Sequence, residues 1–174
     1  MLGLLLLAGA PASAPAKVYH SRAEARELAG PEAARVESDT SVLSEPQVVR
    51  IRELARSEVD SKLVSIYRGM RGDQVLGYAF IDIHIVRTLP EAFMVVLSPE
   101  GSVRSLRMLA FHEPLEYQPA PGWYGQFENK SLAAPLRLGN DVHGVVGATL
   151  SARATTLGVR RSLAFYHVLV NGEK

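Results

Sequence analysis

The pattern of the chain changes at residue 62, and this change constrains the fold more than any other feature of the sequence. After it come four runs rich in β-branched and aromatic residues, which are typical of strands: 63–67, 75–86, 92–97 and 103–111. Short segments of turn-forming residues separate these runs: Gly72-Asp73, Leu89-Pro90 and Pro99-Glu100-Gly101. Strands joined by such short turns pair antiparallel, so the sequence predicts a meander.

Segments with helical signals precede the predicted strands. A capping box at its start predicts a helix over 22–29. Ser44 is expected to cap a second helix, which has Pro46 in its first turn and apolar residues on one face. An alternating pattern over 35–43 predicts a further strand between the two helices.

The last third of the chain is expected to be irregular first and helical afterwards. Residues 112–148 are rich in Gly and Pro, with one helical turn expected over 123–127. A helix is expected from about 151 to 170. Strands flanked by helices at both ends indicate an α+β fold, an antiparallel sheet flanked by N-terminal helices and a C-terminal helix. A length of 174 residues favours a single domain.

Composition excludes several classes of function. The 19 Lys and Arg residues nearly balance the 18 Asp and Glu, so the net charge of +1 offers no electrostatic surface for nucleic acid. The absence of cysteine excludes disulfide scaffolds, Cys-ligated zinc, iron–sulfur clusters and thiol catalysis. The five histidines have none of the close spacings of a zinc or copper motif, so no metal site is expected.

The first 16 residues, MLGLLLLAGAPASAPA, are typical of a secretory signal peptide. The apolar run over 2–10 is shorter than the ~20 residues of a transmembrane helix, and 14–16 has the small residues of a cleavage site. No Lys or Arg precedes the run, although one is typical of a signal peptide. The alternatives are a buried N-terminal segment and an uncleaved membrane anchor. We expect a signal peptide over 1–16 and an extracytoplasmic protein, in the periplasm or at the outer face of the cytoplasmic membrane.

The strongest candidate site is the segment 143–151, HGVVGATLS, directly before the last helix. Its glycines and Ala148 leave the backbone unobstructed. Free backbone N–H groups and the positive end of the helix dipole suit a phosphate at such a place. The Thr149 hydroxyl is then able to bind a phosphate or to be esterified to one. In the alternative interpretation, Thr149 or Ser151 is only the N-cap of the helix.

The same segment resembles a known family. The residues Gly147-Ala148-Thr149-Leu150-Ser151, followed by ARATTLGVRRSLAFY, are similar to the end of the FMN-binding domain family. That family includes the flavin-carrying subunits of the Rnf and sodium-translocating quinone reductase complexes, and its typical signature is Asp-x-x-Ser/Thr-Gly-Ala-Thr. In those members the last threonine is joined to the FMN phosphate through a phosphodiester bond, which a separate FAD-dependent flavin transferase forms.

Other segments of the chain occur in the order typical of that family. They are DQVLGY at 73–78, PEGSV at 99–103, HEP at 112–114 and WYGQFENK at 123–130, the last similar to a W-x-x-Q-F-x-x-K segment. The resemblance covers roughly 62–170. It implies an FMN-binding domain over 62–174, preceded by a helical and strand-containing extension over 17–61.

Two positions depart from the family signature. His143 stands where Asp is typical, and Val146 replaces Ser or Thr, while Asp141 lies two positions too early. The resemblance implies FMN as the cofactor and Thr149 as its covalent anchor. The other residues that it implies around the cofactor are His143, Val146, Gly147, Ala148, Leu150 and Ser151. Because of the departures, covalent and noncovalent FMN at this helix start both stay open.

A second candidate group lies at the end of the second long strand. Alternation places Asp82 and His84 on the same face of the sheet. In the functional interpretation, His84, Arg87 and Thr88 line the flavin pocket. In the other interpretation, Arg87 pairs with Glu91 at the strand end and His84 faces solvent.

Aromatic and basic residues near the last helix are the remaining candidates. Trp123 either shields one face of the isoalloxazine ring or packs beneath the loop, and Phe127 is expected to pack there. Arg153, Arg160 and Arg161 are expected to form a solvated face of the helix, with Arg153 also within reach of the phosphate.

The leading functional hypothesis is an exported electron-transfer protein that carries FMN, a carrier more than an enzyme. Its expected partners are a flavin transferase and membrane or periplasmic redox proteins. One alternative is a flavin-dependent reductase of a soluble acceptor, with His84 or His143 as the proton donor. Another is a degenerate domain without flavin that serves as an interaction or sensory module.

Overall fold

The computed structural model describes Ala33 and residues 35–172. In chain order its elements are β1 (Arg35–Val42), α2 (Glu45–Ala55), β2 (Leu63–Arg71), β3 (Gln74–Ile85), β4 (Pro90–Leu97), β5 (Val103–Phe111), the 3₁₀ segments η1 (Leu115–Tyr117) and η2 (Pro121–Phe127), and α3 (Thr149–Leu169). The expected strands, the helical turn and the closing helix are therefore confirmed within a few residues. The predicted signal peptide and the helix expected over 22–29 lie outside the described residues.

The strands form one antiparallel sheet with the order β1-β2-β3-β4-β5. This is the meander that the short turns predict, and it confirms the α+β class. All eight residues of β1 pair with β2, so the strand expected before residue 62 belongs to the same sheet.

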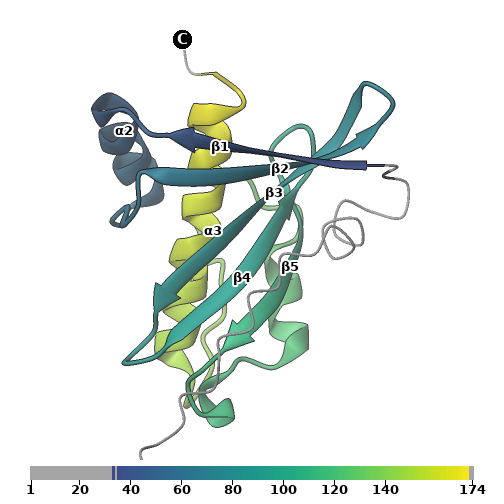
Figure 1. Ribbon diagram of the computed structural model, residues 1–174. Coiled ribbons are helices and arrows are strands. Elements are labelled where there is room, and N and C mark those ends of the chain that lie inside the picture. Colours follow the sequence, from purple (N-terminus) through teal and green to yellow (C-terminus); the bar gives the residue numbers. More distant parts are fainter. Residues whose placement is uncertain (1–32, 34, 173–174) are drawn as a thin grey trace, which may run out of the picture.

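The pairing of β2 with β3 is shorter than that of the other neighbouring strands. It uses Tyr67–Arg71 of β2 and stops where Tyr67 meets Ala79. Beyond this point, residues 63–66 of β2 and 80–85 of β3 have no register with each other, and the two strands diverge (Figure 1). The sheet therefore contains a split, which we call the β2–β3 split.

The helix α2 begins where the sequence predicts because Ser44 caps it. The Ser44 hydroxyl accepts a bond from the Gln47 N–H at 3.5 Å, and Gln47 Oε1 accepts from the Ser44 N–H at 2.9 Å. Such a reciprocal capping box satisfies two donors that a helix start leaves unpaired. The expected apolar face is confirmed, since Val48, Ile51 and Ala55 are buried.

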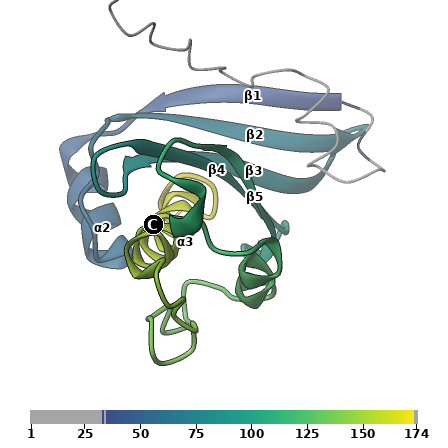
Figure 2. The ribbon, with the colours of Figure 1, turned by 90° about the horizontal axis from the view of Figure 1, so that it is seen from below.

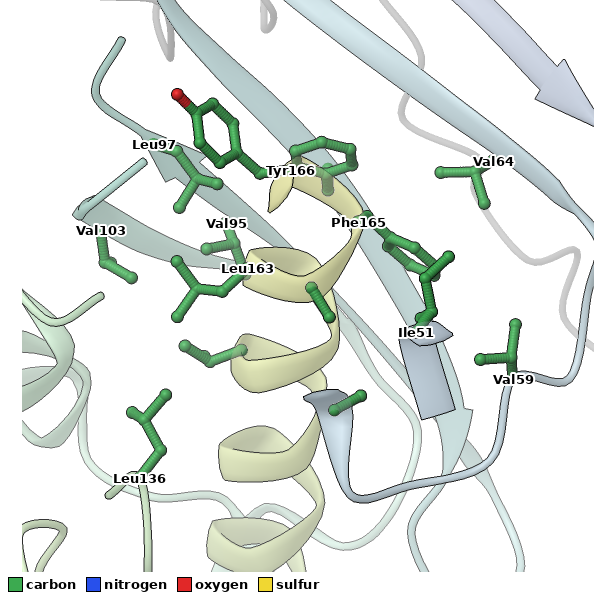
Figure 3. Packing of buried hydrophobic residues seen from close by; sticks show 14 of the residues in the cluster. Ile51, Val59, Val64, Val95, Leu97, Val103, Leu136, Leu163, Phe165 and Tyr166 are labelled. Carbon is green, nitrogen blue, oxygen red and sulfur yellow. The ribbon is translucent and has the colours of Figure 1, made fainter. Parts of the chain in front are cut away.

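The helices α2 and α3 lie on the same face of the sheet, which curves around α3 (Figure 2). The core fills the space between these layers. Figure 3 shows Leu163 and Phe165 of α3 in one cluster with Val95 and Val103 of the sheet and Ile51 of α2. Burying each such side chain stabilises the fold by about 1.5–3 kcal/mol, which fixes α3 on the sheet. Within the described residues, no helix combines the length and apolarity that crossing a membrane requires.

Candidate functional site

The helix α3 begins at Thr149, slightly earlier than the sequence predicts. Its N-cap residue is Ala148, and no side chain caps the helix. The Ala152 N–H donates to the Ala148 carbonyl at 2.9 Å, so the N–H groups of Thr149, Leu150 and Ser151 have no helical carbonyl to bind. The interpretation of Thr149 or Ser151 as the N-cap is therefore wrong, and the helix start keeps its donors.

The surface around this helix start is open to solvent. Val146 is fully exposed and Leu150 is half exposed. Gly147 has a φ of 83°, a left-handed conformation that favours glycine, and the space that a Cβ would occupy is empty. Thr149 is exposed, and its hydroxyl donates to the Val145 carbonyl at 3.2 Å. A molecule in solvent can therefore reach both the backbone and the Thr149 hydroxyl.

Ser151 lies in the same turn but has a different environment. It is fully buried, and its hydroxyl has no hydrogen-bond partner among the described residues. Leaving a buried polar group unpaired costs about 1–3 kcal/mol, so such groups are rare in native structures. The first turn of α3 thus combines free backbone donors, an exposed hydroxyl and a buried unpaired hydroxyl.

The segment WYGQFENK holds the loop that precedes α3. Trp123 Nε1 donates to the His143 carbonyl at 2.7 Å, and the His143 N–H donates to Gln126 Oε1 at 2.7 Å. Gln126 Nε2 in turn donates to the Trp123 carbonyl at 2.9 Å. Phe127 is fully buried in the core, which confirms its expected packing role. Two side chains of η2 therefore fix the backbone of His143 from both sides, while the His143 side chain is exposed.

Asp141 organises the first half of the same loop. Its carboxylate accepts the N–H groups of Leu136 at 3.1 Å and Arg137 at 2.9 Å, and it pairs with Lys130 Nζ at 3.1 Å. Burial would raise the pKa of Asp141, but the hydrogen bond from Arg137, followed by those from Lys130 and Leu136, holds that pKa below its usual 3.8. Asp141 is thus ionised at neutral pH and is engaged within the loop.

His84 belongs to a buried polar cluster between β3, β4 and α3. We define this β3–α3 cluster by Asp82, His84, Glu91, Thr155 and Arg161. His84 Nδ1 lies 2.6 Å from Asp82 Oδ1, and Nε2 lies 2.8 Å from Glu91 Oε1. Arg161 binds both carboxylate oxygens of Asp82, at 2.7 and 2.8 Å. Thr155 Oγ1 donates to Glu91 Oε1 at 3.2 Å. The cluster links the sheet to α3 by charge-assisted bonds, which are stronger than neutral ones.

The cluster holds Asp82 and His84 in their charged forms. Burial would lower the pKa of His84, but hydrogen bonds to Asp82 and Glu91, followed by their charges, raise it to about 9. Burial would raise the pKa of Asp82, but the hydrogen bonds from His84 and Arg161 keep it below 3.8. His84 is therefore protonated at neutral pH. The interpretation in which it faces solvent is wrong, and Glu91 pairs with His84 instead of Arg87.

Arg87 and Thr88 lie in the turn between β3 and β4. The N–H groups of Arg87, Thr88 and Leu89 all donate to Glu113 Oε1, at 3.1, 2.8 and 2.9 Å. These donors, Thr88 first, lower the pKa of Glu113 below its usual 4.5. The Arg87 guanidinium lies 5.1 Å from the centre of the Tyr117 ring. The turn and the start of α3 lie at the same end of the molecule (Figure 1), with no hydrogen bond or ion pair between them in the described part of the chain.

The expectation of a solvated face is wrong for Arg160 and Arg161. Arg160 is only 6% exposed, and it donates to the carbonyls of Leu54 at 2.7 Å and Ala134 at 3.0 Å. Long basic side chains bury their apolar stems readily when their ends find acceptors, and here the acceptors are one carbonyl in the last turn of α2 and one in the loop before α3. Arg153 is exposed, as expected.

Sequence reasoning did not predict the β3–α3 cluster as a unit. A signal was present in FIDIHI at 80–85, where polar residues alternate with isoleucine inside a strand. The inward face of that strand is the polar one, since Asp82 is buried while Ile83 is 64% exposed. Its partners Glu91 and Thr155 lie on other elements, so only the fold brings them together. No group of residues suited to hold a metal ion occurs among the described residues.

No protein-family model matches the chain, and no curated protein matches it at a significant level. The likeness to the FMN-binding domain family therefore rests on the sequence segments themselves.

Proposed function

We propose that the protein is an FMN-binding electron carrier whose cofactor phosphate lies at the start of α3, esterified to Thr149. The observation that carries this proposal is the exposed Thr149 hydroxyl beside three backbone N–H groups that no helical carbonyl accepts. A helix start of this kind favours a phosphate through its donors and its dipole. The resemblance of Gly147-Ala148-Thr149 and of the WYGQFENK segment to the FMN-binding family supports FMN as the phosphate compound.

The residues present fit a phosphoester at this position. The segment from His143 to Arg153 contains no carboxylate that would repel a phosphate. Gly147 leaves open space beside the helix start, and the unpaired hydroxyl of Ser151 belongs to the same turn. The exposed Arg153 adds a positive charge one turn from Thr149. The lack of a carboxylate and the charge of Arg153 favour an anion over a neutral or cationic ligand, and the space beside Gly147 leaves room for it.

The chain's own part in the proposed function is to hold the cofactor. FMN supplies the electron-transfer chemistry when it is bound. Thr149 provides the covalent anchor, and the backbone donors of the first turn bind the phosphate. Trp123 and Gln126 keep the preceding loop in one conformation through the backbone of His143. His84 is buried between the carboxylates of Asp82 and Glu91, at 2.6 and 2.8 Å, which favours a carrier over a reductase that uses this residue as a proton donor.

The partners follow from the same proposal. A flavin transferase would attach FMN, and membrane or periplasmic redox proteins would exchange electrons with it. Val146 and Leu150 are exposed apolar residues on either side of Thr149, and they offer such partners a contact surface next to the anchor. Covalent attachment also suits the expected extracytoplasmic location, because a cofactor that dissociates there is lost by dilution.

The test is to express the full chain with and without a flavin transferase and to measure in-gel flavin fluorescence and intact mass. We expect transferase-dependent fluorescence that survives denaturation, with the mass of one FMN added. Thr149→Val and Thr149→Ala should abolish both signals, whereas Thr149→Ser keeps the hydroxyl and should retain them.

A matched control is Thr40→Val, which removes another exposed threonine hydroxyl, on β1, and should leave the attachment intact. A yellow protein that loses its colour on denaturation would show that FMN is bound noncovalently and that Thr149 is not a covalent anchor. A folded, colourless and unmodified protein would overturn the electron-carrier proposal.

A further inference from the structure

The strand β3 has an open edge inside the sheet. It pairs with β4 as far as Ile85, but its pairing with β2 ends at Ala79. In an antiparallel sheet, alternate residues direct their N–H and C=O groups to opposite sides of the strand. Half of the main-chain groups over 80–85 therefore face the β2–β3 split instead of a neighbouring strand.

A cavity of about 340 Å³ occupies this split. Both diverging strands and α3 contribute to its walls, which include Leu63, Tyr67, Ile81, Ile83, Arg161 and Phe165. Cavities of about 300–1,000 Å³ with mostly apolar walls are the size of ligand sites. The volume of this cavity lies at the lower end of that range.

The rim of the split is apolar and exposed. Leu63 is 63% exposed, Ile83 is 64% exposed and Ile85 is 61% exposed. Sheet edges are usually protected from other strands by Lys, by Pro or by solvated charges. The segment FIDIHI has neither Lys nor Pro, and its one carboxylate is buried and paired with Arg161. The edge therefore lacks the usual features that prevent strand addition.

The floor of the split offers no unbalanced charge. The guanidinium of Arg161 binds Asp82 with two nitrogens, while Nη1 donates to Ser57 Oγ at 3.2 Å and to the Glu58 carbonyl at 3.3 Å. The remaining ionisable groups in the lining are Asp60, which is exposed, and Tyr67, whose pKa burial raises. This arrangement disfavours an anionic ligand and favours an uncharged one that uses main-chain hydrogen bonds.

We propose that the edge of β3 at 80–85 binds an extended, uncharged peptide segment of a partner protein, which adds to the sheet as a strand. Main-chain bonds provide the affinity, and apolar side chains at alternate positions pack beside Leu63 and Ile83. The inference does not depend on the proposed flavin function. The second half of α3 forms the wall of the split, with Arg161 and Phe165, whereas the proposed phosphate site is its first turn.

The test uses a phage-displayed library of nine-residue peptides in which apolar and uncharged polar positions alternate, selected on the full chain. Enriched peptides are synthesised, and their affinity is measured by titration calorimetry. We expect binding that protects amides of 80–85 from hydrogen exchange. Single N-methyl groups are then placed at each peptide residue in turn. A methyl group at every second residue should abolish binding, and one at the residues between them should leave binding nearly unchanged, since only one set of peptide N–H groups faces β3.

Substitutions at the rim provide the second measurement. Ile83→Glu and Leu63→Glu alter exposed side chains, so the fold should persist, and each should weaken binding by at least about tenfold, or about 1.4 kcal/mol. Val49→Glu, an exposed apolar position on α2, is the matched control and should bind like the original chain. Affinity that is unchanged in both rim variants would overturn the proposal, as would a library that yields no peptide with a dissociation constant below about 1 mM.

Discussion

The β3–α3 cluster and the start of α3 are two polar regions with opposite organisation. In the cluster, His84, Asp82 and Arg161 satisfy one another at 2.6–2.8 Å beneath the sheet. At the start of α3, by contrast, backbone donors have no helical acceptor and Thr149 is exposed. Both regions are suggested as flavin-site candidates by the sequence, and the structure separates them.

The difference teaches that polar character alone does not mark a binding site. A buried group that is fully paired has little capacity left for a ligand, and its removal harms the fold. An exposed group with free donors contributes little to stability and retains its capacity to bind. Substitutions in the two regions should therefore differ most in their effects on folding.

The largest effect is expected from Asp82→Asn. It removes the charge that His84 and Arg161 share and leaves two cations without their carboxylate, which lowers the free energy of unfolding by about 3–5 kcal/mol. Urea denaturation at neutral pH measures this loss. The control Asp39→Asn affects an exposed carboxylate 3.9 Å from Arg68 and should cost less than about 1 kcal/mol. Similar losses in both variants would contradict the structural role of the cluster.

The second effect is a loss of stability in alkaline solution. The pKa of His84 is about 9 in the fold and about 6.5 in the unfolded chain, so the fold binds this proton more tightly. Its contribution is fully present below about pH 6.5 and disappears as the pH rises through about 9. The expected change is on the order of 3 kcal/mol, at about 1.4 kcal/mol per pKa unit.

Unfolding free energies measured between about pH 6 and pH 10 test this dependence on His84. His84→Gln should flatten the profile over that range. Tyr124, whose pKa burial raises to about 12, stays neutral throughout and does not obscure the result. A profile of equal slope in the variant would assign the dependence to another group.

A smaller effect is expected from Gly158→Ala, where α3 crosses the cluster. A Cβ at this position would lie 2.5 Å from Phe93 Cζ and 2.7 Å from Asp82 Oδ1, so α3 or the cluster must shift. We expect a loss of about 1–3 kcal/mol in thermal unfolding, although alanine favours helices more than glycine does. Gly122→Ala, which meets no atom within 4 Å, should leave stability unchanged and is the control.

Trp123→Phe tests the loop before α3. The variant keeps an aromatic ring but removes the donor to the His143 carbonyl, which should cost about 0.5–1.5 kcal/mol. Amide exchange should accelerate over 143–148 and stay unchanged in β3 and β4. Uniform acceleration across the molecule would mean that the bond supports the whole fold and not the loop in particular.

The smallest effect on folding is expected from Thr149→Val. The side chain is exposed and its one hydrogen bond, to the Val145 carbonyl at 3.2 Å, is at the surface, so the change should stay within about 0.5 kcal/mol. The same variant should lose flavin attachment completely. A large loss of stability would contradict the contrast between the two regions.

Local signals explain what the sequence predicts well. The strands and turns follow from residue type and spacing, and the cap at Ser44 follows from one side chain and the donors next to it. Phe127 is predicted as buried because an aromatic residue in a long loop usually seals the core. Each of these features depends on neighbours within a few residues of the chain.

Features that depend on distant residues are the ones that sequence patterns miss. Arg161 has a partner 79 residues away in Asp82, so its position on α3 gives no indication of burial. The β2–β3 split depends on where pairing stops, and the strand-like runs over 63–67 and 75–86 include the unpaired residues of both strands, so residue type does not indicate the split. The open start of α3 depends on the N-cap, and a threonine at that place is as compatible with capping as with ligand binding.

The chain order of the sheet has a consequence for biosynthesis. Each strand pairs with the one before it, so the sheet can assemble while the chain is still being made. The helix α3 is the last described element to be synthesised. It contains both Leu163, which completes the core, and Thr149, the proposed anchor. In the proposed function, the transferase then meets a helical acceptor only after α3 has formed. Flavin attachment would therefore report that folding has finished, and chains that stall earlier would stay unmodified.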